Sequence, residues 1–199
     1  GYLQPQALLR DRDAIRRELQ VERDERLILV PAGGGEDGHA LVQTYTKTLQ
    51  HMPPRARIRS LIVTGPEMSE PQRNTLNQSA LRFPGVSMLE FTNDLPSYMN
   101  ASDLVVSMGG YNTVCEILGL KKRAIIVPRV RPVEEQWIRA ERMASLDLLT
   151  TIHPDLLTPQ GLLDTILVEI SSDQPLRPTL DLTALPTLTN HVSMLLDGT

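Results

Sequence analysis

The feature that most constrains the fold is a regular alternation of short apolar runs with longer segments of helical spacing. The first run, Leu27-Ile28-Leu29-Val30-Pro31, is continuously apolar, which is typical of a strand buried on both faces. Further strand-like runs lie at 60–64, 86–90, 103–107, 123–127 and 149–152, and helix-like segments follow at 39–51, 69–81, 95–101, 110–120, 133–146 and 158–171. Because parallel crossovers are right-handed, this alternation predicts a doubly wound α/β fold with a mostly parallel, six-stranded, Rossmann-like sheet.

The two ends of the chain differ from this alternating middle. Residues 6–26 are rich in charge and carry apolar residues at near-helical spacing, so we expect 1–26 to be a helix or linker that leads in from a missing N-terminal domain. We expect 27–199 to form one domain with a C-terminal tail. The tail is rich in proline from Asp173 onward, which predicts loops and a last short helix near 188–196. The chain opens on Gly1 without Met, and we interpret it as a piece of a longer protein.

Composition excludes several classes of protein. The 199 residues carry 20 basic and 24 acidic side chains, a net charge of −4, whereas non-specific nucleic-acid binding needs a clustered basic excess. No apolar run approaches the roughly 18–20 residues of a membrane-spanning helix. The single cysteine, Cys115, rules out an internal disulfide and a multi-cysteine zinc site. We therefore expect a cytoplasmic protein that binds no nucleic acid and touches a membrane, if at all, only through the missing domain.

Ligands of an open α/β sheet bind at the carboxyl ends of its strands, where three loops have unusual sequences. The first is Gly33-Gly34-Gly35-Glu36-Asp37-Gly38. Its glycines suit close approach to a phosphate at a helix N-terminus, or else a tight turn in which Asp37 caps the next helix. It lacks the acidic partner of a dinucleotide motif and the Lys-Ser/Thr of a Walker loop. His39 either reaches the same phosphate or is merely solvated.

The other two loops follow the fourth and fifth predicted strands. A helix that begins near Gly110 would present its first N–H groups to an anion, and Glu116 one turn further on could hold vicinal hydroxyls or could be a solvated helix residue. Cys115 is best explained as a small apolar filler. The third loop, Pro128 to Gln136, places Arg129 and Arg131 before Glu-Glu-Gln. These charges could bind a phosphate, and the acidic residues could equally serve the helix dipole.

Together these residues resemble the C-terminal, donor-binding half of a GT-B glycosyltransferase, and family 28 above all. The resemblance covers about residues 27–155 and rests on Glu90-Phe91, Asp94, Ala101–Ser107, Gly110, Thr113–Ile117, Ile126–Pro128 and Glu135-Gln136. The stretch Met108–Glu116 is similar to a subgroup of predicted bacterial glycosyltransferases. Two loops depart from the family pattern: Met108 stands in place of a basic residue, and Arg129 and Arg131 replace a Gln-His-type pair.

The resemblance implies a role for each matching residue. Glu116 would bind the ribose hydroxyls of a nucleoside diphosphate sugar. The residues at the start of the following helix would face the diphosphate: Gly109, Gly110, Asn112 and Thr113. Phe91 and Thr92 would border the base, and Gln136 and Glu135 would contact the donor sugar. The loop at the cleft between the two domains would be formed by Gly33, Gly34 and Gly35.

The resemblance also implies an activity. The full-length protein would be an inverting glycosyltransferase that transfers a hexose from a nucleotide sugar, expected to be a UDP sugar, to an acceptor hydroxyl. The catalytic residues and the acceptor site would lie in the missing N-terminal domain, so the chain alone should transfer nothing. We expect no metal and no further cofactor.

Two other hypotheses about function are compatible with the same fold. One is a domain of a sugar-nucleotide 2-epimerase or a related hydrolase, whose donor half is similar. The other is a binding module that kept the fold and lost catalysis. A flavodoxin-like receiver and an NAD-binding domain fit less well, because the first lacks its acidic cluster and the second leaves Glu116 without a role.

Overall fold

The structure of the chain is a computed structural model that describes residues 8–34 and 37–172. The loops expected from Asp173 onward, the helix expected near 188–196, and Gly35 of the glycine-rich loop lie outside these residues.

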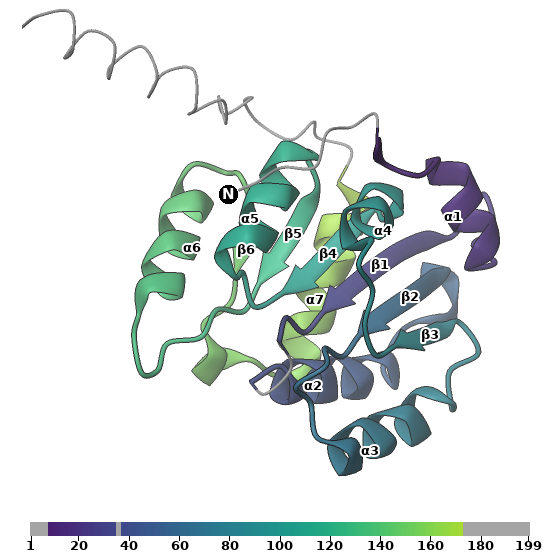
Figure 1. The fold of residues 1–199 in the computed structure, drawn as a ribbon, viewed down its shortest axis with the longest axis horizontal. Helices are drawn as coiled ribbons and strands as arrows, with labels where there is room; N and C mark the ends of the chain where they lie inside the picture. The colour runs from purple at the N-terminus through teal and green to yellow at the C-terminus, as the bar shows by residue number, and fades with distance from the viewer. Residues whose placement is uncertain (1–7, 35–36, 173–199) are drawn as a thin grey trace, which may run out of the picture.

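All six strands run parallel in one sheet (Figure 1). The strands are β1 (Arg26–Pro31), β2 (Ile58–Val63), β3 (Val86–Leu89), β4 (Leu104–Ser107), β5 (Arg123–Ile126) and β6 (Thr150–Thr151). Their order is β3-β2-β1-β4-β5-β6, so the chain builds outward from β1 on one side and then returns to build from β4 on the other. The predicted doubly wound sheet is confirmed, and its switch point lies between β1 and β4.

Helices cover both faces of this sheet. They are α1 (Arg12–Glu18), α2 (His39–Leu49), α3 (Glu70–Ala80), α4 (Leu95–Ala101), α5 (Tyr111–Gly119), α6 (Glu135–Ser145) and α7 (Pro159–Ser171), with the short 3₁₀ turns η2 (Pro54–Ala56) and η3 (Pro154–Leu156). The predicted helix at 133–146 begins later, at Glu135, because Glu134 serves as its N-cap. From α2 to α7 the other helices begin and end within a few residues of their predicted bounds, whereas α1 occupies only Arg12–Glu18 of the predicted helix or linker over 1–26.

The two faces of the sheet carry separate apolar cores. Alternate residues of β1 point to opposite sides: Ile28 and Val30 pack with residues of α2, α3 and α7, whereas Leu27 and Leu29 pack with residues of α1, α4, α5 and α6. Every one of these β1 side chains is buried. This two-sided burial explains why the strand sequence is continuously apolar rather than alternating.

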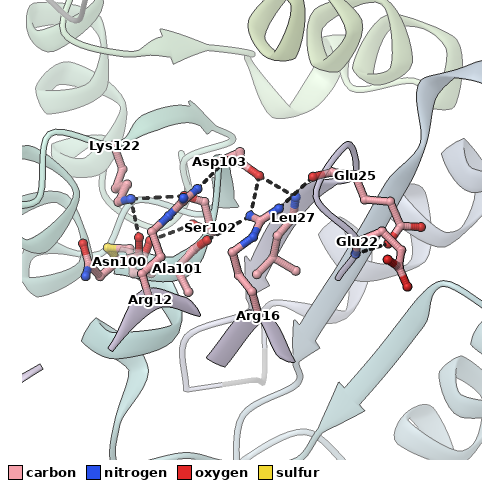
Figure 2. A network of polar contacts seen from close by, with 11 residues as sticks. Arg12, Arg16, Glu22, Glu25, Leu27, Asn100, Ala101, Ser102, Asp103 and Lys122 are labelled. Atoms are coloured by element: carbon pink, nitrogen blue, oxygen red, sulfur yellow. Dashed lines mark hydrogen bonds and ion pairs between the residues drawn. The ribbon is translucent and has the colours of Figure 1, made fainter. Parts of the chain in front are cut away.

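The short helix α1 is fixed to the amino ends of β1 and β4 (Figure 2). Its Ile15 is fully buried in the second core. The Asp103 carboxylate accepts hydrogen bonds from Arg12 at 2.8 Å, from Arg16 at 2.9 Å and from the backbone N–H of Leu27 at 2.8 Å. The helix therefore packs as part of the folded unit, while a domain boundary at residue 26 stays a prediction.

Candidate functional site

A pocket of about 230 Å³ lies at the carboxyl end of the sheet, at the predicted switch point. The loops after β1, β4 and β5 meet there, and the loop after β2 joins them. The residues that line it are Pro31, Ala32, Gly33, Gly34, Asp37, Glu67, Ser107, Met108, Gly110, Thr113, Arg129 and Gln136. Five of the predicted site residues, namely Gly33, Gly34, Gly110, Thr113 and Gln136, are thus brought together.

The glycine-rich loop is braced by the loop that follows β2. The backbone N–H of Glu67 donates to the carbonyl of Gly34 at 2.8 Å. Gly65 has a φ of +85°, and a Cβ there would lie 2.4 Å from the carbonyl oxygen of Gly33, so this close approach requires glycine. The contact holds the loop against its neighbour and leaves its other side facing the pocket.

Of the two alternatives for the glycine-rich loop, the one in which Asp37 caps α2 is wrong. Gly38 is the N-cap residue of that helix, and no side chain bonds to its first turn. The Asp37 carboxylate instead pairs with Arg129 from the loop after β5, with 2.8 Å between Oδ2 and Nη1. His39 begins α2, is half-buried, and does not line the pocket.

The start of α5 is built to leave backbone donors unused. Gly110 is the N-cap, no side chain caps the helix, and the first bond within the helix runs from the N–H of Val114 to Gly110 at 3.0 Å. The N–H groups of Asn112 and Thr113 precede that bond and have no acceptor within the helix. These donors, together with the positive end of the helix dipole, favour an anion.

Gly109 sets the direction in which α5 begins. Its φ is +70°, a Cβ there would lie 2.5 Å from Cγ2 of Ile126, and its N–H donates to Ser107 Oγ at 2.9 Å. Ser107 lies in the pocket wall. The small residues after β4 therefore turn the chain tightly from the strand into the helix.

Arg139 of α6 supports this turn from the side. Its guanidinium donates to the carbonyl of Gly109 at 3.1 Å and to Glu135 at 2.8 Å, and it lies over the ring of Tyr111 at 5.7 Å. Sequence reasoning did not identify Arg139. The four-residue spacing from Glu135 signals an ion pair within a helix, but nothing local signals the contact with Gly109.

Of the two residues predicted to contact the donor sugar, only one lines the pocket. Gln136 lines the pocket, and its Oε1 accepts from the backbone N–H of Arg129 at 3.1 Å. Glu135 pairs with Arg139 and does not line the pocket. Sequence reasoning also did not single out Glu67 or Ser107 as pocket residues.

Glu116 lies on the second turn of α5, three residues after Thr113 and so on the same face of the helix. It is half-buried, and burial raises the pKa of its carboxyl above the ordinary value. Its side chain has no hydrogen bond or ion pair with the described residues. It remains a candidate acceptor for hydroxyl groups, although it does not line the pocket itself.

The remaining predicted residues also lie outside the pocket. Phe91 follows β3 and is 63% exposed. Thr92 accepts the N–H of Asp94 at 3.0 Å through its hydroxyl. Gly109 directly precedes the pocket residue Gly110, and Asn112 directly precedes the pocket residue Thr113, but neither lines the pocket itself. Their predicted roles at the base and diphosphate stay predictions.

The described residues contain neither a candidate metal site nor a candidate membrane-spanning helix. No group of three or more His, Cys, Asp or Glu side chains is arranged to hold a metal ion. No described helix has both the length and the apolar character to span a membrane.

A doubly wound sheet with a glycine-lined pocket at its switch point defines a Rossmann-like α/β domain, and two solved structures share this fold. MurG of Acinetobacter baumannii superposes with a TM-score of 0.67 at 20% identity, covering 92% of this chain and 53% of that one. A UDP-GlcNAc 2-epimerase of Neisseria meningitidis, bound to UDP-GlcNAc, superposes with a TM-score of 0.55 at 12% identity, covering 82% of this chain and 44% of that one.

The sequence narrows this class to one family. Residues 27–179 match the family model of the glycosyltransferase family 28 C-terminal domain, and the chain belongs to that family. A curated relative from Haemophilus influenzae is 26% identical over 145 residues, covering 72% of this chain and 39% of the relative. It is a UDP-N-acetylglucosamine--N-acetylmuramyl-(pentapeptide) pyrophosphoryl-undecaprenol N-acetylglucosamine transferase. The chain spans about two fifths of the length of the curated relatives it matches.

Proposed function

We propose that this chain is the donor-binding domain of an inverting glycosyltransferase and binds a nucleoside diphosphate sugar at the carboxyl end of its sheet. The observation that carries the proposal is the uncapped start of α5, which opens into a pocket lined by Gly110, Thr113 and Gln136. Backbone donors at this point would hold the diphosphate and stabilise the negative charge that develops on it as the sugar leaves.

The parts of the ligand are assigned along the same edge of the sheet. Glu116, half-buried and without a side-chain partner among the described residues, would accept the ribose hydroxyls. Phe91 and Thr92 would border the base. Gln136 would contact the donor sugar, and Glu135 would join it only by exchanging its partner Arg139. Gly33, Gly34 and Gly35 would face the cleft toward the acceptor domain.

We propose a UDP sugar as the donor and a hexose as the transferred group. Support comes from the relatives that are named as UDP-N-acetylglucosamine transferases and from the structural neighbour bound to UDP-GlcNAc. The acceptor site and the catalytic residues would lie in an N-terminal domain of the full-length protein. The chain alone should bind nucleotide and transfer nothing.

A second candidate is a domain of a sugar-nucleotide 2-epimerase, which the Neisseria neighbour favours at the level of fold. The two activities differ in whether they need an acceptor. A transferase consumes the nucleotide sugar only when an acceptor is present, whereas an epimerase acts on the nucleotide sugar alone. Incubating the full-length protein with UDP-N-acetylglucosamine and no acceptor separates them. Formation of the C2 epimer of the sugar under those conditions, either still attached to UDP or released from it by water, would favour the epimerase.

The test of nucleotide binding is a thermal-shift panel of UDP, GDP, dTDP, CDP, ADP and NAD. A ligand that binds only the folded state stabilises it, by roughly 2.7 kcal/mol at a hundredfold excess over Kd. We expect the largest shift with UDP and its loss in Glu116→Ala. The matched control is Glu141→Ala, an exposed carboxylate of α6 that does not line the pocket. Equal losses in both variants would contradict the ribose assignment, and a shift with NAD alone would contradict the donor-domain function.

A further inference from the structure

One ion pair stands at the boundary between two neighbouring pockets. Besides the 230 Å³ pocket, a second pocket of about 320 Å³ opens at the same edge of the sheet. Both are lined by Asp37, Met108 and Arg129. The 2.8 Å bridge from Arg129 to Asp37 joins the loop after β5 to the glycine-rich loop after β1.

The charges in the proposed diphosphate pocket are unfavourable for an anion as they stand. Among the described residues that line it, two are carboxylates, Asp37 and Glu67, and one is a cation, Arg129. The only cationic side chain of the described pocket wall is thus already neutralised by a carboxylate. A diphosphate would need that guanidinium, because α5 supplies partial charge only.

The bridge is of a kind that a ligand can displace. The side chains of Arg129 and Asp37 are 47% and 50% exposed, and exposed pairs of this sort contribute little to stability. The Arg129 backbone, by contrast, is anchored by its hydrogen bond to Gln136. The guanidinium can therefore change partner by side-chain rotation while the loop stays in place.

We propose that Arg129 is a diphosphate-binding residue, that Asp37 holds its guanidinium while the site is empty, and that the ligand's phosphate replaces Asp37 as its partner. The inference rests on the proposed function. It adds a specificity determinant that sets the affinity for the charged part of the nucleotide without touching the base. Guanidinium groups bind phosphate oxygens through paired, charge-assisted hydrogen bonds, which makes the exchange favourable.

The experiment compares UDP with uridine, which lacks phosphate, by ligand-observed NMR on the wild-type chain and its variants. We expect Arg129→Ala to weaken UDP binding by about tenfold to a hundredfold, the usual worth of a hydrogen bond to a charged group, and to leave uridine unchanged. Asp37→Asn should strengthen UDP binding severalfold by removing the competing carboxylate. In the Arg129→Ala background the same Asp37→Asn change should give a smaller gain.

The matched control is Arg131→Ala, an exposed arginine of the same loop that lines the second pocket alone. Three results would overturn the inference while the proposed function stands: UDP affinity unchanged in Arg129→Ala, equal losses in Arg129→Ala and Arg131→Ala, or weaker UDP binding in Asp37→Asn. Failure of the wild-type chain to bind UDP would instead overturn the proposed function, and this inference with it.

Discussion

At the scale of single residues, Lys122 is a largely buried cation whose pKa is lowered by folding. Burial is the main cause, aided by Arg12 and opposed by Asp103, and it lowers the pKa of the ammonium to about 8 (Figure 2). The ammonium donates to the backbone carbonyls of Asn100 and Ser102. These contacts use two of its three N–H donors and keep a partly desolvated charge near Arg12 and Arg16.

The lowered pKa predicts a pH dependence of stability. Below about pH 8 Lys122 is charged in both folded and unfolded states, so its desolvation penalty is fully present. Between about pH 8 and the unfolded value near 10.4 the folded state has lost the proton and the unfolded state still binds it, so stability rises with pH. Relative to Lys122→Met, the wild-type chain should gain roughly 2–3 kcal/mol of unfolding free energy between about pH 7 and about pH 10.

Urea unfolding of the two proteins at both pH values measures this difference. The comparison uses the change with pH, because Lys122→Met also leaves the carbonyls of Asn100 and Ser102 without their donor at either pH. A difference between the proteins that stays constant from neutral to alkaline pH would show that the Lys122 pKa is close to its ordinary value.

At the scale of elements, the turn from β4 into α5 contains two consecutive glycines, and only the first of them is sterically required to be glycine. Gly109 has a positive φ and its Cβ position is blocked by Ile126, whereas Gly110 has a φ of −53° and nothing lies within 4 Å of its Cβ position. We expect Gly109→Ala to lower the unfolding free energy by about 1–3 kcal/mol or more, from backbone strain and overpacking. Gly110→Ala should cost less than about 1 kcal/mol.

Chemical denaturation of both variants checks this pair. Since the N–H groups of α5 that we propose to bind the diphosphate depend on the turn, UDP binding should fall in Gly109→Ala more than in Gly110→Ala. Similar unfolding free energies for the two variants would mean that the chain relaxes around Ile126 and that the turn is not sterically fixed.

Elements were more predictable from sequence than the contacts between them. The run from Leu27 to Pro31 is apolar throughout because both faces of β1 are covered, so strand and parallel sheet follow from local pattern. The helix start at Gly110 follows equally from local chemistry. The Arg129–Asp37 bridge and the Arg139–Gly109 contact join residues 92 and 30 positions apart, and only the packed sheet brings them together. For the same reason, the local sequence offered Asp37 as a possible cap of its own helix, an alternative that the structure contradicts.

At the scale of the whole molecule, the folded unit extends upstream of the family match. That match begins at residue 27, yet Ile15 is fully buried and Arg16 and Arg12 bond to Asp103 at the base of β4. Removing α1 would expose the core beside Leu27 and leave the Asp103 carboxylate with only one of its three donors, a backbone N–H.

We therefore expect a chain that begins at Arg26, the first residue of β1, to be less stable than one that begins at Leu8 by at least about 3 kcal/mol, from the lost burial of Ile15 and the broken ion pairs. The chain that begins at Leu8 keeps every described contact and is the matched control. Thermal unfolding followed by circular dichroism compares the two. Equal midpoints would place the boundary of the folded unit at the start of β1.

Because of the order of the strands, the pocket is assembled from segments that lie far apart in the chain. The pocket walls come from segments as far apart in the chain as Pro31 and Gln136, and they meet only because β1, β4 and β5 lie side by side. No contiguous stretch of the sequence shorter than that span contains the whole site. If the chain binds nucleotide as proposed, a polypeptide cut between α3 and β3 and supplied as two pieces would bind it only after reassembly, so the ligand itself would report that the two halves had associated.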